Sequence, residues 1–461
     1  MELIEARVKP PLDEDFRPAV LANRNFQRRA RPVGVRAVIG LERNGGEISR
    51  FETLVYPENH PDFELNLPYI ERIVKFLLWQ RGGHTLYIGA SKAIAEHICG
   101  VYSSSGARKF DSHFMGSLVY EKEFCVVAST AAEVPAARET GKLLGRHLNG
   151  CRIGFDLGAS DRKVSAVMDG NAIYSEEVVW EPRKQADPEH HYREIMTALK
   201  TAASKLPRVD AIGGSSAGIY VENRPMVASL FRGIPQERFG EIKDMFLRIR
   251  REMGVPLEVI NDGDVTALAG SMSIGDNGIL GIALGSSEAA GYVNMEGHLM
   301  GWLNELAFAP IDYNPNAPVE EWSGDKGCGA SYFSQQCVFR LAPKAGIEIP
   351  ASTGVTDAEK LKFVQNKLEE GDPGAQKIWE SMGVYLGYGL AHYADFYDIK
   401  HVLILGRCTS GHGGDLLIKG VKNVFVNEFP ELSQKIELHL PDEKIRRVGQ
   451  SVAAASLPVI E

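Results

Sequence analysis

The chain has 461 residues, of which 44% are hydrophobic and 24% charged, and its formal net charge is −9. At roughly 100–200 residues per domain, this length predicts two to four domains whose cores need no disulfide or metal to hold them together. The acidic balance argues against a nucleic-acid partner, which would require a broad cationic face. The longest apolar runs are too short to form a membrane helix, and the charged start lacks a signal-peptide core. We therefore expect a cytoplasmic protein with no membrane partner, in which the six widely spaced cysteines are reduced thiols.

The N-terminal region reads as an α/β domain that follows an irregular arm. Residues 1–30 are rich in Pro and Arg and show no periodicity, which predicts the arm. Two alternating apolar runs, 33–41 and 49–56, flank Asn44-Gly45, a strong hairpin signal. The elements expected next are a helix over 67–80, a strand over 85–88, a helix capped by Ser91 and a strand over 123–128. We place a domain boundary near residue 148, and the sequence does not reveal the role of residues 1–148.

The pattern of elements changes after residue 149. Hairpin strands followed by alternating helices and strands occur twice, which predicts α/β architecture with a mixed sheet in each half, residues 149–265 and 266–461. The first half should contain strands over 152–156, 163–168, 172–179, 209–213 and 257–260, with helices over 192–204 and 235–253. The second should contain strands over 279–284, 290–294 and 401–405, with helices over 375–396 and 442–457.

Two motifs place carboxylates at the ends of predicted strands. Asp156-Leu157-Gly158-Ala159-Ser160 combines a carboxylate that can hold a metal ion through water with small residues that let backbone N–H groups approach a phosphate. Asn261-Asp262 stands where Asp262 can take the proton of a substrate hydroxyl and Asn261 can orient that substrate. Both motifs also have a structural interpretation, since Asp and Gly are common turn residues and Asp262 or Asp264 can cap the helix that follows.

Two further motifs consist of small residues at chain turns. Gly285-Ser286-Ser287 opens a hairpin that can face a triphosphate, and it is equally typical of a tight turn in a packed sheet. Gly406 connects a predicted strand to a helix, a geometry that suits a nucleoside and also any ordinary crossover.

The order and spacing of these motifs resemble the ROK family of repressors and sugar kinases, within the actin-like ATPase superfamily, over residues 150–461. The resemblance implies a two-lobed actin-like ATPase (ribonuclease H-like) fold, with residues 1–148 as an addition. It makes Asp156-Leu157-Gly158 the first phosphate loop, Gly285–Gly291 the second, and Leu405-Gly406 the adenosine loop. It also places Gly218 in the sugar-side loop, Asn261 and Asp262 as the substrate-orienting and catalytic residues, and Glu305 as a sugar-binding carboxylate.

This sequence departs from the family's pattern at its zinc-binding and sugar-binding positions. The zinc-ligating His of the family is Phe308 here, and of its three Cys only Cys328 remains. A structural zinc site needs four ligands, so we expect no zinc in this protein. A second sugar-binding Glu is replaced by Ala330, and the glycine-rich second phosphate loop carries Glu288.

The resemblance implies an ATP-dependent kinase that phosphorylates a hydroxyl of a sugar-like substrate. Asp262 would be the base, and Asn261, Glu305 and Gly218 would bind the substrate. Nucleotide and phosphate would contact Asp156, Gly158, Ser160, Gly285, Ser286, Ser287 and Gly406, with Mg²⁺ held by Asp156 through water. The alternative is a non-catalytic small-molecule sensor that retains the fold. A homodimer stays open, because homodimers are the commonest soluble assembly.

Overall fold

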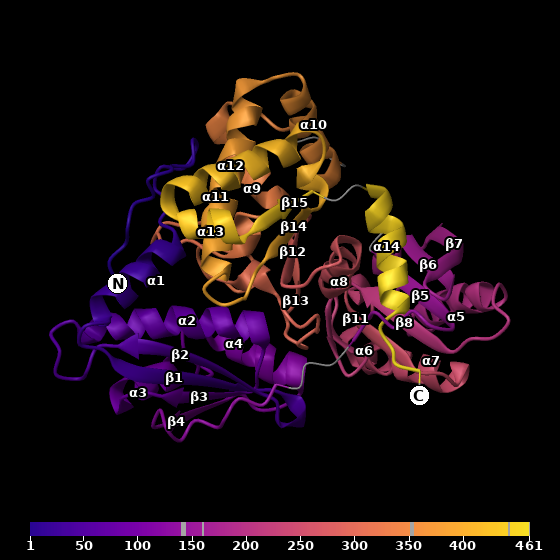
Figure 1. Ribbon diagram of the computed structural model, residues 1–461, viewed down its shortest axis with the longest axis horizontal. Coiled ribbons are helices and arrows are strands. Elements are labelled where there is room, and N and C mark those ends of the chain that lie inside the picture. The colour runs from indigo at the N-terminus through magenta and orange to yellow at the C-terminus, as the bar shows by residue number, and fades with distance from the viewer. Residues whose placement is uncertain (140–143, 159–160, 351–354, 441–442, 461) are drawn as a thin grey trace. The chain divides into compact units, whose positions relative to one another are not determined.

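The computed structural model describes residues 1–139, 144–158, 161–350, 355–440 and 443–460 (Figure 1). The chain forms two compact units. Unit 1 comprises residues 1–140, 282–290 and 302–440, and unit 2 comprises residues 141–281, 291–301 and 441–461. Both contain helices and mixed sheets, which confirms the predicted α/β class. Across the described residues, no helix combines the length and apolar character that a membrane span requires.

The N-terminal part of unit 1 is a four-stranded sheet of order β2-β1-β3-β4. Its strands are β1 (Val35–Glu42), β2 (Ile48–Val55), β3 (Thr85–Gly89) and β4 (Cys125–Ser129). Its helices are α1 (Ala19–Ala30), α2 (Asn66–Arg81), α3 (Lys92–Val101) and α4 (Lys109–His113). The predicted hairpin is confirmed, with Val35 paired to Val55 in antiparallel register. The prediction of an arm over all of residues 1–30 is wrong, because α1 buries one face through Val20, Ala22 and Phe26.

The second sheet of unit 1 has the order β13-β12-β14-β15, and two of its strands, β12 and β13, extend into the residues of unit 2. Its strands are β12 (Ile279–Leu284), β13 (Glu288–Val293), β14 (His401–Leu405) and β15 (Glu437–His439). The accompanying helices are α9 (Gln335–Leu341), α10 (Asp357–Glu369), α11 (Pro373–Tyr393), α12 (His412–Glu428) and α13 (Pro430–Lys435). Helix α11 is buried along almost its whole length and packs along α12. The segment that precedes α1 contacts α11, because the Leu12 N–H donates to Ser381 Oγ at 3.1 Å.

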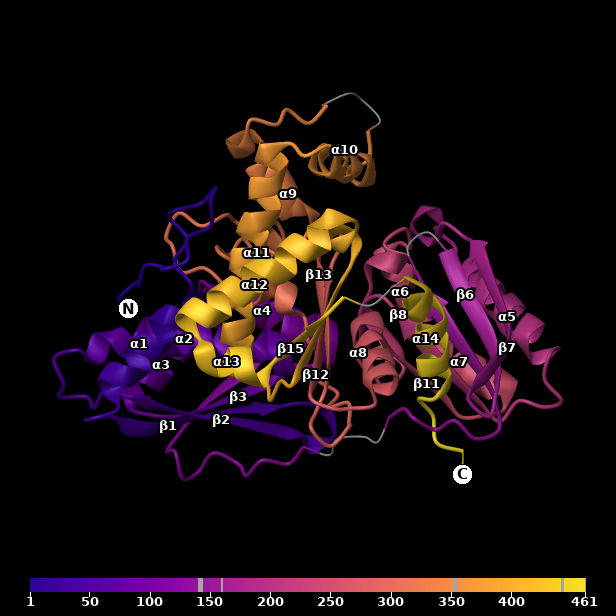
Figure 2. The ribbon, with the colours of Figure 1, turned by 45° about the horizontal axis from the view of Figure 1, so that its top comes forward.

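Unit 2 is built on a five-stranded mixed sheet of order β11-β8-β5-β6-β7. Its strands are β5 (Cys151–Leu157), β6 (Asp161–Met168), β7 (Asn171–Val179), β8 (Ala211–Ser216) and β11 (Leu257–Asn261), and a separate ribbon pairs β9 (Ile219–Val221) with β10 (Arg224–Val227). Its helices are α5 (Pro188–Ala203), α6 (Phe239–Lys243), α7 (Met245–Met253), α8 (Asp262–Ile274) and α14 (Glu443–Ala455). Helices α5 and α7 contact one another, as do α8 and α14, and the two pairs cover opposite faces of the sheet (Figure 2).

Glycines in β5 and β8 let α14 pack directly on the backbone of the sheet. A Cβ atom at Gly213 would lie 1.6 Å from the carbonyl oxygen of Ala454, and one at Gly154 would lie 1.9 Å from that of Ser451. Gly213 is thus a strand residue whose lack of a side chain is required by packing.

One element prediction differs from the structure in unit 2. The single helix expected over 235–253 is interrupted at Asp244, which separates α6 from α7. The domain boundary expected at residue 265 falls inside α8, and α14 returns from the end of the chain to the sheet of unit 2. The division into segments 1–148, 149–265 and 266–461 stays a prediction about folding units.

Candidate functional site

The site in unit 2 is built where the parallel strands β5, β8 and β11 end at the same edge of the sheet. Asp156 pairs with Ser215 in the register of β5 and β8, and Asn261 pairs with Ser216 in that of β8 and β11. Since parallel strands end at a common edge, the side chains at these positions gather there. Asp156, at the end of β5, and Asp262, directly after β11, therefore lie at one edge of one sheet.

Asp156 is held by a hydroxyl and faces one ammonium group. Ser215 Oγ donates to Asp156 Oδ1 at 2.7 Å, and Lys163 Nζ lies 3.9 Å from Asp156 Oδ2. The Asp156 side chain is 13% exposed, and burial raises the pKa of its carboxyl despite these two partners. Lys163 is closer to Asp161, at 3.2 Å, so its charge is shared between two carboxylates.

Asn261 joins the start of α8 to the sugar-side loop of the resemblance. Its Oδ1 accepts the Gly263 N–H at 2.7 Å, which caps the helix, and its Nδ2 donates to the carbonyl oxygen of Gly218 at 2.8 Å. The helix cap that the sequence suggested at Asp262 or Asp264 is provided by Asn261 instead. Both polar groups of this amide are engaged, and Gly218 and Asn261 are brought together.

Asp262 is a carboxyl group whose surroundings disfavour its charged form. Burial, followed by the negative charge of Asp156, raises its pKa to about 6, and the Gly263 N–H at 3.0 Å offsets part of this shift. A carboxyl with a pKa near neutrality is suited to general-base work at physiological pH. Carboxyl groups whose pKa values are raised by burial and by a second carboxylate cluster at functional sites, which makes Asp262 a candidate site residue.

The first phosphate-loop residues are only partly described. Ser160 lies outside the described residues. The Gly158 N–H donates to the carbonyl oxygen of Asp161 at 2.9 Å, and Trp180 Nε1 donates to the Gly158 carbonyl at 3.0 Å. The backbone of Gly158 thus closes its own hairpin turn.

The remaining predicted nucleotide residues lie in unit 1. Gly285, Ser286 and Ser287 form the turn between β12 and β13, with the Gly285 N–H donating to the Ser287 carbonyl at 3.1 Å. Ser286 and Ser287 are more open to solvent than the strands on either side. Gly406 follows β14 with a φ of 97°, and a Cβ atom there would lie 2.4 Å from the carbonyl oxygen of Leu284. Strands β12 and β14 therefore end side by side, and glycine is required at 406.

Glu288 and Glu305 form a second group of interacting carboxyls, within unit 1. Glu288 is 3% exposed and accepts a hydrogen bond from Tyr393 Oη at 2.8 Å. Burial raises the pKa of Glu288 to about 8, and the charge of Glu305 adds to this effect. Glu305 itself is fixed by its backbone N–H, which donates to the Trp79 carbonyl at 2.9 Å. The Glu288 side chain is thus turned into the interior of unit 1, away from solvent.

The segment that resembles the family's zinc site is held by the N-terminal part of the chain. Phe308, at the position of the zinc-ligating His, stacks on Trp79 of α2 with ring centroids 4.1 Å apart. Cys328 is buried, which raises the pKa of its thiol to about 12 and disfavours the thiolate that binds metal. Residues of this segment are thus packed against α2 rather than gathered as ligands.

Asp325 anchors this segment through three cations. Its Oδ2 lies 2.8 Å from Arg72, 2.8 Å from Arg108 and 3.3 Å from Lys75. Lys75 also contacts Asp111 at 3.1 Å, and Trp79 Nε1 donates to Asp111 at 2.9 Å. These cations hold the pKa of Asp325 far below its usual range despite burial. The cluster is a buried ion-pair network that joins α2 to residues 321–330.

Sequence reasoning missed several residues that shape these sites. Ser215 carried a signal, since it follows Gly213-Gly214 at a strand end, but its hydrogen bond to Asp156 depends on strand register. Tyr393 lies at the end of a buried helix with nothing in the sequence to connect it to Glu288, 105 residues earlier.

About two thirds of the chain can be compared with known structures. No sequence family and no curated protein matches the chain. A ROK family glucokinase from Streptomyces griseus, in complex with glucose and AMPPNP, is 20% identical with a TM-score of 0.50, over 66% of this chain and 99% of that chain. The chain has the ROK fold.

Two further structures support the same conclusion about the fold. A ROK hexokinase from Thermus thermophilus is 18% identical with a TM-score of 0.50, over 66% of this chain and 97% of that one. A ROK family transcriptional regulator, a homologue of the E. coli MLC protein, is also 18% identical with a TM-score of 0.50, over 67% and 78%. Kinases and a regulator share this fold, so the fold fits both a sugar kinase and a sensor.

Proposed function

We propose that the protein is an ATP-dependent kinase that transfers the γ-phosphoryl group to a hydroxyl of a sugar-like substrate. The observation that carries the proposal is the pair Asp156 and Asp262, in which burial and the charge of Asp156 raise the pKa of Asp262 to about 6. In the proposed reaction the substrate oxygen bonds to the γ-phosphorus, the bond to the ADP oxygen breaks, and the hydroxyl proton passes to the Asp262 carboxylate. Asn261 fixes the backbone on which Asp262 stands.

Asp156 fits the role of an Mg²⁺ ligand through water. Mg²⁺ is bound through one or two carboxylates together with waters and substrate phosphates. Asp156 provides such a carboxylate, oriented by Ser215 and incompletely neutralised by Lys163. When bound, the ion would neutralise charge on the transferring phosphoryl group. Gly158, Gly285, Ser286, Ser287 and Gly406 keep their proposed nucleotide roles, together with Ser160. Glu305 and Gly218 keep theirs toward the substrate.

The position of Glu288 removes one objection to nucleotide binding. A carboxylate among the phosphate-loop residues would repel a triphosphate by about 1–4 kcal/mol at 4 Å, depending on the dielectric. Glu288 instead bonds to Tyr393 in the interior of unit 1, and its raised pKa keeps it largely protonated at neutral pH. Phe308 and Ala330 favour the second candidate, a sensor that binds a small molecule without turnover, because both replace polar contacts of the family.

Calorimetric titration with AMPPNP and Mg²⁺, followed by a phosphoryl-transfer assay over a panel of sugars, tests the proposal. We expect Asp262→Asn to lower kcat by about 10²–10⁴-fold, because the base is lost, with nucleotide affinity nearly unchanged. Asp244→Asn is the matched control, since Asp244 is a 64% exposed carboxylate of the same unit. Full turnover in Asp262→Asn contradicts the assignment of the base. Nucleotide or sugar binding without transfer in the unaltered protein favours the sensor.

A further inference from the structure

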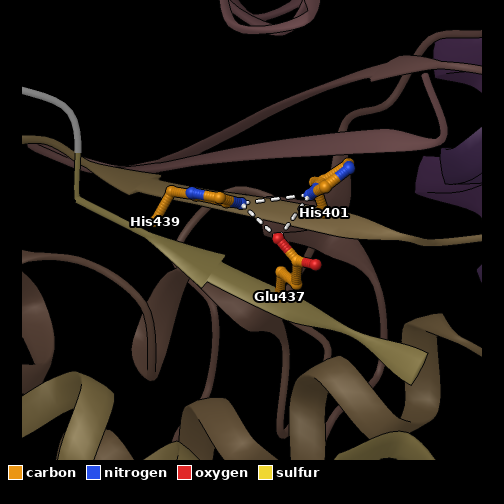
Figure 3. A group of neighbouring side chains, drawn as sticks. All are labelled: His401, Glu437 and His439. Carbon is orange, nitrogen blue, oxygen red and sulfur yellow. Dashed lines mark hydrogen bonds and ion pairs between the residues drawn. The ribbon is translucent and has the colours of Figure 1, made fainter. Parts of the chain in front are cut away.

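Two histidine side chains and one glutamate side chain lie close together on β14 and β15 of the second sheet of unit 1. His401 stands on β14, and Glu437 and His439 stand on the neighbouring strand β15 (Figure 3). The strands are parallel, with His401 paired to Glu437 and Leu403 to His439. Since side chains alternate along a strand, Glu437 and His439 point to the same face, and His401 meets them there from the adjacent strand.

The three donor atoms converge on one point. His401 Nδ1 lies 3.1 Å from His439 Nε2, His401 Nδ1 lies 3.6 Å from Glu437 Oε2, and His439 Nε2 lies 3.9 Å from the same oxygen (Figure 3). A point equidistant from three atoms at these separations is about 2.1 Å from each, within the range of Zn–N and Zn–O bonds. The separations of the three donor atoms are therefore compatible with an ion of this size.

The donor set selects the kind of metal. Imidazole nitrogens suit Zn²⁺, Ni²⁺, Cu²⁺ and Fe²⁺, whereas Mg²⁺ and Ca²⁺ prefer all-oxygen sites. A neutral imidazole binds a metal ion through a ring-nitrogen lone pair, and the carboxylate balances one of the two metal charges. This set differs from Asp156 and Asp262, which offer only oxygens.

The three side chains are buried to different extents, so one side of the site is open to water. The His401 side chain is 4% exposed and fixes one ligand, whereas those of His439 and Glu437 are 30% and 69% exposed. Zn²⁺ sites with three protein ligands complete their coordination with water or another small ligand. A hydrogen bond between the two imidazoles would explain why they touch. It would not explain why the Glu437 carboxylate oxygen faces both rings.

We propose that His401, Glu437 and His439 form a binding site for a divalent transition-metal ion such as Zn²⁺, with the remaining coordination supplied by solvent. The site is separate from residues 321–330, which resemble the family's zinc segment and pack on α2. Because β15 pairs with β14 over only three residues, a bound ion would fasten this short strand to the sheet.

Titration of the metal-free full chain with ZnCl₂ at pH 7.5, in excess Mg²⁺ to occupy oxygen sites, tests the proposal. We expect one equivalent of Zn²⁺ to bind, and His439→Ala to weaken that binding by about 100-fold or more. His412→Ala is the matched control. His412 lies 3.4 Å from the carboxylate of Glu369, with both side chains exposed, and no third ligand converges on this pair within the described part of the chain.

Folding and spectroscopy keep the result unambiguous. Glu437→Gln changes the most exposed of the three side chains and should leave the fold intact while weakening Zn²⁺ binding. Replacing Zn²⁺ with Co²⁺ should give the visible absorption of a nitrogen- and oxygen-ligated ion, lost in His439→Ala and kept in His412→Ala. The proposal is overturned if the unaltered chain binds no Zn²⁺, or if the equivalent survives both His439→Ala and Glu437→Gln.

Discussion

Asp325 in unit 1 and the pair Asp156 and Asp262 in unit 2 have opposite electrostatic surroundings. In unit 1, Asp325 contacts Arg72, Arg108 and Lys75, and these cations lower its pKa. In unit 2, burial and then the charge of Asp156 raise the pKa of Asp262, and Lys163 lies 3.9 Å from Asp156 while also contacting Asp161. The negative charge of Asp325 is balanced by neighbouring cations, whereas the charges of Asp156 and Asp262 are balanced only in part.

The difference separates a structural cluster from a functional one. A buried carboxylate surrounded by cations satisfies its own charge and holds the elements that supply them. A buried pair of carboxylates without such cations destabilises the fold and is therefore expected where a metal, a proton or a substrate completes it. Asp325 joins α2 to residues 321–330, whereas Asp156 and Asp262 retain an incomplete charge balance.

The largest effect should come from breaking the compensated cluster. Asp325→Asn leaves Arg72, Arg108 and Lys75 without their shared partner, and we expect it to lower the free energy of unfolding by about 3–5 kcal/mol. Denaturant unfolding measures this loss. Asp398→Asn is the control, because Asp398 and Lys435 form an exposed pair in the same unit, for which we expect about 1 kcal/mol or less. A loss no larger than that of the control would show that the cluster does not hold α2 in place.

A change of intermediate size should come from Glu288, a buried carboxyl whose pKa is governed by burial rather than by a cation. Its pKa is raised from 4.5 to about 8, so its contribution to stability is present below pH 4.5 and lost as pH rises through 8. We expect Glu288→Gln to stabilise the protein by about 2–4 kcal/mol at pH 8.5 and to have little effect at pH 4.5. Unfolding measured across this pH range checks it, with Glu370→Gln, an exposed glutamate, as control. An equal effect at both ends would mean that the carboxyl does not titrate as described.

The elements that the sequence predicted best are those bounded by their own residues. Strands β12 and β14 match the prediction because each is a continuous apolar run that ends at a glycine. Helix α1 was missed because its arginines and the prolines around it hide a narrow apolar face. The interruption at Asp244 divides a helix whose periodicity continues on both sides, so the pattern alone could not locate it.

The candidate sites were predictable to the extent that they follow from strand ends. Asp156, Asn261 and Asp262 gather because parallel strands end together, which the order of elements already implied. The partners of Asp325 could not be predicted, since Arg72 lies 253 residues away and belongs to a domain that the resemblance does not cover. The inward orientation of the Glu288 side chain depends on its hydrogen bond with Tyr393 and on the turn before β13. The sequence around Glu288 indicates neither of them.

The comparison is tested most directly by an Asp→Asn substitution at Asp262, in the pair of carboxylates whose charges are not fully balanced. Asp262→Asn removes the repulsion with Asp156 and keeps an oxygen that can accept the Gly263 N–H. The pKa of Asp262 is raised from 3.8 to about 6, so its stabilising contribution is present below pH 3.8 and lost as pH rises through 6. We therefore expect Asp262→Asn to increase the free energy of unfolding by about 1–3 kcal/mol at pH 8, with little change at pH 4.

The sign of this effect is opposite to that of Asp325→Asn, although both changes replace one buried carboxylate by an amide. Chemical unfolding at pH 8 and pH 4 measures both variants side by side, in buffer without Mg²⁺ so that no ion compensates the pair. Adding Mg²⁺ and AMPPNP should then stabilise the unaltered chain, because ligand binding to the folded state offsets the repulsion. If Asp262→Asn is destabilising at pH 8, the carboxylate belongs to a satisfied structural network, and the physical argument for its role as a base is lost.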